Sequence, residues 1–290
     1  MCGTCGGHGA RLDDTDVLAA SRIVVVGKGG VGKSTLSAVL ARLLARRGYD
    51  VLAVDADEQR NLGVALGMTP SDAAGVRAVA EDAAYVEEKT GARPGEGQGA
   101  MLRLNLDTAD VVARCAVEAA DGVRLLVMGG VRSAGSGCLC PETALIAAAV
   151  SGMRQGEADV VLMDTHAGVE HFGRALARGF GTAVVVVEPT FTSVQVGLDS
   201  ARMATELGID TVHLVVNRTT SEADIDRALA HAEALGGFEF ASVTALPHDQ
   251  LVRESEPSVG PLLEGSRFGR AAAGLLDTVL GLHQLYEALV

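Results

Sequence analysis

A glycine-rich stretch near the start of the chain has the composition of a phosphate-binding loop. Residues 27–35 read GKGGVGKST, which matches the pattern G-x-x-x-x-G-K-S. Glycines allow consecutive backbone N–H groups to turn inward around phosphate oxygens, and the start of a following helix adds its dipole. We expect Lys33 to reach the β- and γ-phosphates and the Ser34 hydroxyl to bind Mg²⁺. The other residues expected to bind the nucleotide here are Gly29, Gly30, Val31, Gly32 and Thr35.

Two cysteines that stand one residue apart form a second chemical feature. Cys138 and Cys140 lie in GSGCLCPETA, and the chain has only five cysteines. A disulfide between them would close a strained, very small ring, whereas both thiolates can reach one soft metal ion. Two ligands do not complete a tetrahedral site. The missing two come either from a second copy of the chain or from Cys2 and Cys5, unless the pair is simply two small residues buried in a turn.

The residues before about position 21 contain further candidate metal ligands. This segment begins MCGTCGGHG and has no apolar period, so we interpret residues 1–20 as a flexible arm. Cys2, Cys5 and His8 form either a second metal site or an arm with incidental thiols. Cys115 lies in a helix-compatible segment and is interpreted as a small core residue.

Alternating apolar segments must position these groups. A strand over 21–27 precedes the glycine-rich loop, a helix over 34–48 follows it, and a second strand spans 51–57. Further helices are expected at 71–89 and 266–290. Continuous apolar strands that alternate with helices predict an α/β fold, a mostly parallel sheet with helices on both faces, in one domain over 21–290. The remaining strands are expected at 123–129, 159–164, 182–189, 212–217 and 240–247.

Composition limits the classes of partner. The chain has 290 residues, of which 48% are hydrophobic and 21% charged, and its net charge is -13. The negative charge disfavours a nucleic-acid partner held through phosphates. No apolar run approaches the roughly 20 residues of a membrane-spanning helix, and residues 1–16 lack the apolar core of a secretion signal. We therefore expect a cytoplasmic protein without membrane insertion, whose cysteines are thiols or metal ligands.

A second lysine in the loop carries a resemblance to a known family. Only three of the 24 basic residues are lysines, and Lys28 and Lys33 stand five residues apart. The stretch KGGVGKS resembles the deviant Walker-A ATPases, the MinD/ParA/nitrogenase-iron-protein group of P-loop NTPases. The resemblance implies that Lys28 reaches the nucleotide of a partner chain, so that a homodimer encloses two ATP molecules.

The same resemblance implies roles for several residues at strand ends. VDADEQRN (54–61) is similar to the family's switch I, so Asp57 would position the attacking water while Asp55 caps the strand. MDTHAGVEH (163–171) is similar to its switch II, so Asp164 would hold Mg²⁺ together with Ser34. His171 either couples the nucleotide state to the dimer interface or lies on a helix surface. Residues implied on the purine side are Asn217, Arg218, Pro247 and Asp249.

Within this group the chain most resembles the CooC-type ATPases. The similar segments are residues 125–146, which include the C-x-C pair followed by proline, and residues 164–172 and 185–197. This resemblance implies an accessory ATPase for nickel insertion into carbon monoxide dehydrogenase as client, with Ni²⁺ or Zn²⁺ shared between the Cys138 and Cys140 thiolates of two subunits. The arm departs from that type and is reminiscent of the nickel-binding start of hydrogenase maturation GTPases.

Three alternatives belong to the same ATPase group. An iron–sulfur cluster carrier of the Mrp/NBP type also joins this core to cysteines, but usually as C-x-x-C. A MinD/ParA-type positioning ATPase would need no cysteines and usually has a basic surface or a membrane helix. A reductase like the nitrogenase iron protein would need a cysteine beside switch II, and residues 164–170 contain none.

Overall fold

The computed structural model describes residues 22–92, 110–129, 140–152, 158–166 and 177–281, without the side chains of 140–143 and 151–152. Several predicted residues therefore lie outside the description. They are Cys2, Cys5, His8, Cys138, His171 and the side chain of Cys140. The assignment of 1–20 as an arm and of 21–290 as a single domain stays a prediction.

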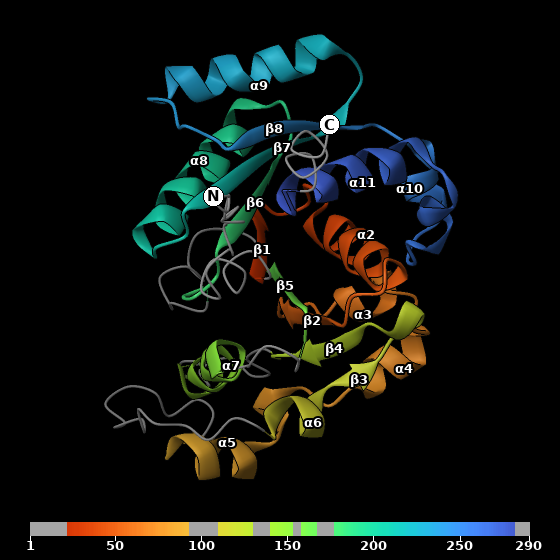
Figure 1. Cartoon of the computed structure of the whole chain (residues 1–290), viewed down its shortest axis with the longest axis vertical. Coiled ribbons are helices and arrows are strands. Elements are labelled where there is room, and N and C mark those ends of the chain that lie inside the picture. Colours follow the sequence, from red (N-terminus) through yellow and green to blue (C-terminus); the bar gives the residue numbers. More distant parts are fainter. Residues whose placement is uncertain (1–21, 93–109, 130–139, 153–157, 167–176, 282–290) are drawn as a thin grey trace, which may run out of the picture.

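The described residues form one eight-stranded sheet in the order β3-β4-β2-β5-β1-β6-β7-β8 (Figure 1). Every neighbouring pair is parallel except β3 and β4. This confirms the mostly parallel sheet predicted from the apolar runs. The short antiparallel β3 was not predicted. The strands are β1 (Arg22–Gly27), β2 (Val51–Ala56), β3 (Val117–Glu118), β4 (Arg124–Val127), β5 (Val160–Thr165), β6 (Thr182–Val187), β7 (Thr211–Thr219) and β8 (Ser242–Pro247).

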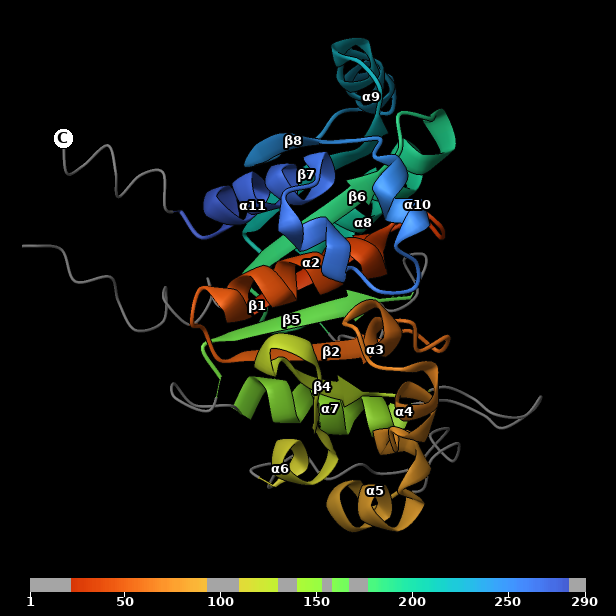
Figure 2. The same cartoon turned by 90° about the vertical axis from the view of Figure 1, so that its right-hand side faces the viewer.

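Helices cover both faces of the sheet because successive strand side chains point to opposite faces. In β1, Ile23 and Val25 enter one buried cluster, whereas Val24 and Val26 enter the other. The first cluster also receives α2 (Lys33–Arg46), α3 (Leu62–Ala65) and α11 (Arg267–Val279), which lie against one side of the sheet in Figure 2. The second receives α5 (Ala83–Thr90), α7 (Cys140–Gly152), α8 (Phe191–Glu206) and α9 (Glu222–Ala234).

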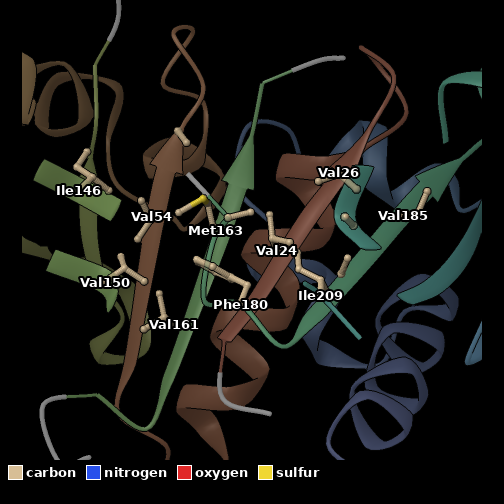
Figure 3. Packing of buried hydrophobic residues seen from close by; sticks show 14 of the residues in the cluster. Val24, Val26, Val54, Ile146, Val150, Val161, Met163, Phe180, Val185 and Ile209 are labelled. Atoms are coloured by element: carbon tan, nitrogen blue, oxygen red, sulfur yellow. The ribbon is translucent and has the colours of Figure 1, made fainter. Parts of the chain in front are cut away.

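The second cluster anchors α7, the helix that begins at Cys140. Ile146 and Val150 of α7 face the strand residues Val54, Val161 and Met163 across the layer (Figure 3). All five side chains are at most 3% exposed. The described part of α7 is therefore packed on the sheet as a core helix.

The prediction of one continuous helix over 71–89 is wrong. The chain forms α4 (Pro70–Gly75), a 3₁₀ turn (Val79–Glu81) and α5 instead. Val76 and Ala78 have extended backbone angles, which end α4, and the Asp82 carboxylate caps α5 by accepting from the N–H of Tyr85 at 3.4 Å. The remaining described helices are α6 (Val111–Cys115) and α10 (Gln250–Glu254). No helix in the described part of the chain is long and apolar enough to cross a bilayer.

Candidate nucleotide-binding site

The glycine-rich loop joins β1 to α2 at the carboxyl end of the central strands. Gly32 has φ 96° and immediately precedes α2, so the open N–H groups of that helix face the loop. A Cβ atom on Gly32 would lie 2.6 Å from Nδ2 of Asn217. Both the left-handed backbone and the close approach of Asn217 therefore require glycine here.

A cavity of about 480 Å³ opens beside this loop. Its lining brings together the loop, the start of α2 and the ends of β2 and β5, which are far apart in the sequence. Lys33, Ser34, Asp57 and His166 all border it. The predicted phosphate-binding residues except Val31 therefore line one cavity, and His166, to which the sequence assigned no role, joins them.

Lys33 is positioned for phosphate and is partly desolvated. Its side chain is 6% exposed, and Nζ donates to the carbonyl of Lys28 at 3.1 Å. Burial lowers the pKa of Lys33, and the nearby carboxylates of Asp164 and Asp57 oppose that effect. An ammonium group with so little water around it binds a phosphate oxygen strongly because competing hydration has already been lost.

Asp164 is the second-last residue of β5, and its carboxylate is fully buried. Its Oδ1 accepts from the Ser37 hydroxyl at 3.0 Å, whereas its Oδ2 has no hydrogen-bond partner among the described residues. Burial raises the pKa of Asp164 to about 6, against the opposing effect of the Ser34 and Ser37 hydroxyls. An unpaired, buried carboxylate oxygen beside a serine hydroxyl fits an oxygen-ligated Mg²⁺ and its water shell.

Asp55 does more than the strand-capping predicted for it. Its carboxylate is fully buried, and it accepts from the N–H of Asp57 at 3.1 Å and from the N–H of Leu62 at 3.0 Å. Burial, followed by the charge of Asp164, raises the pKa of Asp55 to about 7. Asp55 thus ties both ends of the segment 57–62 to the end of β2. The D-x-D spacing was the available signal for this role.

Asp57 itself lies on the cavity and is partly exposed. Its Oδ1 accepts from the N–H of Gln59 at 2.8 Å, which leaves Oδ2 available to a water molecule. The next turn is fixed by Arg60, whose backbone has φ 54° and whose guanidinium pairs with Glu81 at 2.6 Å. Sequence patterns did not single out Arg60 or Glu81, because their contact joins segments that are 21 positions apart.

A second cavity of about 370 Å³ adjoins the first on the side of β7 and β8. Asn217, Arg218, Pro247 and Asp249 line it, as the resemblance implied for the purine side. Asp249 caps α10 by accepting from the N–H of Leu251 at 3.1 Å, and it also accepts from the N–H of Phe268 at 3.1 Å. Its carboxylate therefore shapes the cavity wall.

Lys28 is exposed at the start of the loop. Its Nζ donates to Oγ1 of Thr192 at 3.2 Å, in the first turn of α8. Lys33, in contrast, is buried and turned toward the carboxylates. The two lysines of the loop therefore have different surroundings, and only Lys33 is among the residues that line the phosphate cavity.

The side chains predicted to bind a nickel or zinc ion lie outside the described part of the chain. In the described ranges no group of three or more His, Cys, Asp or Glu side chains is placed to hold a metal ion. Cys115 is a free, half-buried thiol that packs against the core, and burial raises its pKa. His213 is buried and contacts the Ser242 hydroxyl at 2.7 Å, and His231 packs edge-on against Phe191. Cys115 is thus a core residue, as predicted, and the two histidines also have structural surroundings.

A strand, a glycine-rich loop with its lysine, a helix, and acidic residues at the ends of two adjacent strands define a P-loop nucleotide-hydrolysing protein. Residues 23–258 match the family model described as CobQ/CobB/MinD/ParA nucleotide binding domain. The carbon monoxide dehydrogenase accessory protein CooC of Rhodospirillum rubrum is 34% identical over 81% of this chain and 86% of its own length. An uncharacterized ATP-binding protein of Methanocaldococcus jannaschii is 30% identical over 90% of this chain and 98% of its own length.

Solved structures show the same fold. The cell division ATPase MinD of Pyrococcus furiosus superposes with a TM-score of 0.62 at 19% identity, over 90% of this chain and 99% of that one. The chain therefore belongs to the CobQ/CobB/MinD/ParA family of nucleotide-binding proteins, in its CooC-type branch, and is an ATPase.

Proposed function

We propose that this ATPase is an accessory protein for carbon monoxide dehydrogenase that uses ATP to deliver nickel. The observation that carries the proposal is the similarity to the accessory protein CooC over most of both chains. The two-lysine loop and the C-x-C pair at 138–140 support it from the sequence. In this proposal the protein acts in the cytoplasm as a homodimer, and the dehydrogenase is its client.

The proposed chemistry of hydrolysis follows from the cavity. Lys33 and the backbone N–H groups of residues 29–35 hold the phosphates, while Ser34 and Asp164 hold Mg²⁺. Mg²⁺ supplies the charge that neutralises the phosphate oxygens. Oδ2 of Asp57 orients a water molecule toward the γ-phosphate. Asp55 keeps Asp57 in place through the N–H groups of 57 and 62, and Lys28 completes the site of the partner chain.

The orientation of one amide favours adenine over guanine. Nδ2 of Asn217 donates to the carbonyl of Val31 at 2.7 Å, and Oδ1 accepts from the N–H of Arg218 at 2.8 Å. These backbone partners fix which end of the amide is which. The amide then has one N–H and one oxygen lone pair left. These complement N7, an acceptor, and the amino group, a donor, of adenine. Guanine presents two acceptors instead, N7 and O6.

The proposed cargo site uses the thiolates of Cys138 and Cys140. Cys140 is the first residue of α7, whose Leu145 and Ile146 are buried in the core shared with α5. Cys140 therefore begins a helix that is packed on the core. Two such pairs across a two-fold axis would supply four thiolates, which suits Zn²⁺, and Ni²⁺ also binds thiolates but often prefers square-planar geometry.

Metal analysis after anaerobic purification tests this proposal. We expect about one Ni²⁺ or Zn²⁺ per dimer, lost in Cys138→Ser/Cys140→Ser and kept in Cys115→Ser, with ATP binding retained in all three proteins. Removal of residues 1–17 should leave that ion and remove additional ions only if Cys2, Cys5 and His8 form a site. A full metal complement in Cys138→Ser/Cys140→Ser would contradict the proposal. A brown chromophore with acid-labile sulfide would instead indicate an iron–sulfur carrier.

A further inference from the structure

Two adjacent side chains at the end of β7 hold two consecutive carbonyl groups of the phosphate loop. Nη2 of Arg218 donates to the carbonyl of Gly30 at 3.1 Å. Nδ2 of Asn217 donates to the carbonyl of Val31 at 2.7 Å. Both contacts bridge more than 180 positions in the sequence, so only the tertiary structure creates them.

The direction of these carbonyls determines where the loop N–H groups point. In a planar trans peptide the C=O and the N–H lie on opposite sides of the chain. When the carbonyls of Gly30 and Val31 are drawn toward β7, the N–H groups of Val31 and Gly32 are turned the opposite way. Gly30, Gly32 and Lys33, which flank or carry these N–H groups, line the phosphate cavity. The contacts from β7 therefore set the orientation of the phosphate-binding N–H groups.

We propose that Arg218, with Asn217, is a positioning residue that pre-forms the phosphate loop before any nucleotide binds. This role goes beyond the purine-side contact implied by resemblance. It requires that the guanidinium remain fixed, and Glu188 at the end of β6 provides this by pairing with Nη1 of Arg218. Two neighbouring strands thus hold one arginine, which in turn holds the loop.

The backbone around Arg218 has an irregular geometry that accompanies its contact with the loop. Arg218 has φ 58°, a left-handed conformation that is strained for a non-glycine residue. The register between β7 and β8 shifts between Val216 and Thr219, so the ladder is interrupted around Arg218. Asn217 is 5% exposed, and it lies so close to Gly32 that a Cβ atom there would approach its Nδ2 to 2.6 Å. The strain at Arg218 is thus accompanied by direct packing of β7 on the loop.

A positioning role and a base contact predict different ligand dependence. If Arg218 orients the loop, its loss weakens the binding of every ligand that uses the phosphate nest, by the same factor, whatever the base. If Arg218 contacts adenine, its loss weakens only ligands that carry the base. Inorganic tripolyphosphate has the phosphates without the base and separates the two roles.

The test measures dissociation constants of ATP and of tripolyphosphate, with Mg²⁺ present, for wild type, Arg218→Ala and Arg218→Lys. We expect Arg218→Ala to weaken both ligands by about 10-fold, which corresponds to the loss of one charge-assisted hydrogen bond that orients the loop. Arg218→Lys should recover part of both losses, because one donor can still reach Gly30. The thermal midpoint without nucleotide should change little in both variants.

Arg202→Ala is the matched control, since Arg202 also donates to backbone carbonyls, those of Leu235 and Gly237, but far from the loop. It should bind both ligands like wild type. Weaker ATP binding with unchanged tripolyphosphate binding would overturn the proposal in favour of a base contact. Unchanged binding of both ligands would also overturn it. So would a failure of wild type to bind tripolyphosphate, because a pre-formed nest must hold bare phosphates.

Discussion

Asp55 and Asp164 are Cα partners in the parallel ladder between β2 and β5, and both carboxyl groups are fully buried. Two carboxylates at the same level of adjacent strands raise each other's cost of ionisation. Mg²⁺ bound beside Asp164 would offset this repulsion, so the nucleotide-free protein carries strain that its ligand relieves. The pair would therefore favour a bound cation at this end of the sheet.

The raised pKa of Asp55 predicts a pH dependence of stability. The pKa is about 7 in the folded protein and 3.8 in its ordinary state, so between these values the folded protein holds a proton that the unfolded chain releases. This contribution to the free energy of unfolding is complete below about pH 4 and is lost as the pH rises through 7. Asp55→Asn does not titrate and lacks this contribution.

Urea unfolding of wild type and Asp55→Asn without nucleotide checks this expectation. From pH 5 to pH 8 the free energy of unfolding of wild type should fall relative to the variant, by on the order of 1–3 kcal/mol. His213 and the other titrating groups are common to both proteins and cancel in the difference. Parallel pH profiles would show that Asp55 is ionised in the folded state throughout this range.

Asp57→Ala should keep ATP bound and stop hydrolysis. The change removes the carboxylate that faces the cavity but leaves Lys33 and the loop intact, so we expect the rate to fall by about 100-fold or more while the dissociation constant changes little. Glu58→Ala is the control, since Glu58 is an adjacent, exposed carboxylate. Normal turnover by Asp57→Ala would contradict the assignment of 57 to water positioning.

Replacement of each loop lysine should impair a different step. Lys33→Ala is expected to lose ATP binding, whereas Lys28→Ala should bind ATP but dimerise and hydrolyse poorly. Mixed with Asp57→Ala, Lys28→Ala should regain part of its activity, because the site with its own Asp57 receives Lys28 from the other chain. Lys89→Ala, which removes an ion pair to Asp110 at 2.7 Å and a contact over the Tyr85 ring away from the loop, is the control. Confirmed mixed dimers without recovery would rule out action across the interface.

Breaking the Arg60–Glu81 pair should loosen switch I. The ion pair, 2.6 Å between Nη2 of Arg60 and Oε1 of Glu81, holds the turn after Asp57. Each of the two side chains is about one-fifth exposed. We expect Arg60→Ala to lower the hydrolysis rate by about 10-fold with little change in ATP affinity, because the water is less well oriented. Arg60→Glu/Glu81→Arg should recover part of the rate relative to Arg60→Glu. Equal rates in these two proteins would show that the pair has no part in positioning.

Much of this molecule is encoded locally. The apolar runs predicted seven of the strands in the described ranges, six of them mostly buried, because parallel strands covered on both faces are largely apolar. The loop at 27–35 needed only its glycines, lysine and serine to indicate phosphate binding. The roles of Asp57 and Asp164 came from the resemblance of residues 54–61 and 163–171 to the family's switch segments.

Tertiary structure decided what joins these local features. The sequence does not state that Arg218 holds Gly30, that Asn217 packs on Gly32, or that Arg60 pairs with Glu81, because each contact is made by side chains whose distance in space is set by strand order. The same holds for the pKa of Asp55, which depends on complete burial and on Asp164 in the next strand. Residue types and spacing determined which chemistry is present, and packing determined which groups are desolvated and oriented, since both depend on neighbours that are distant along the chain.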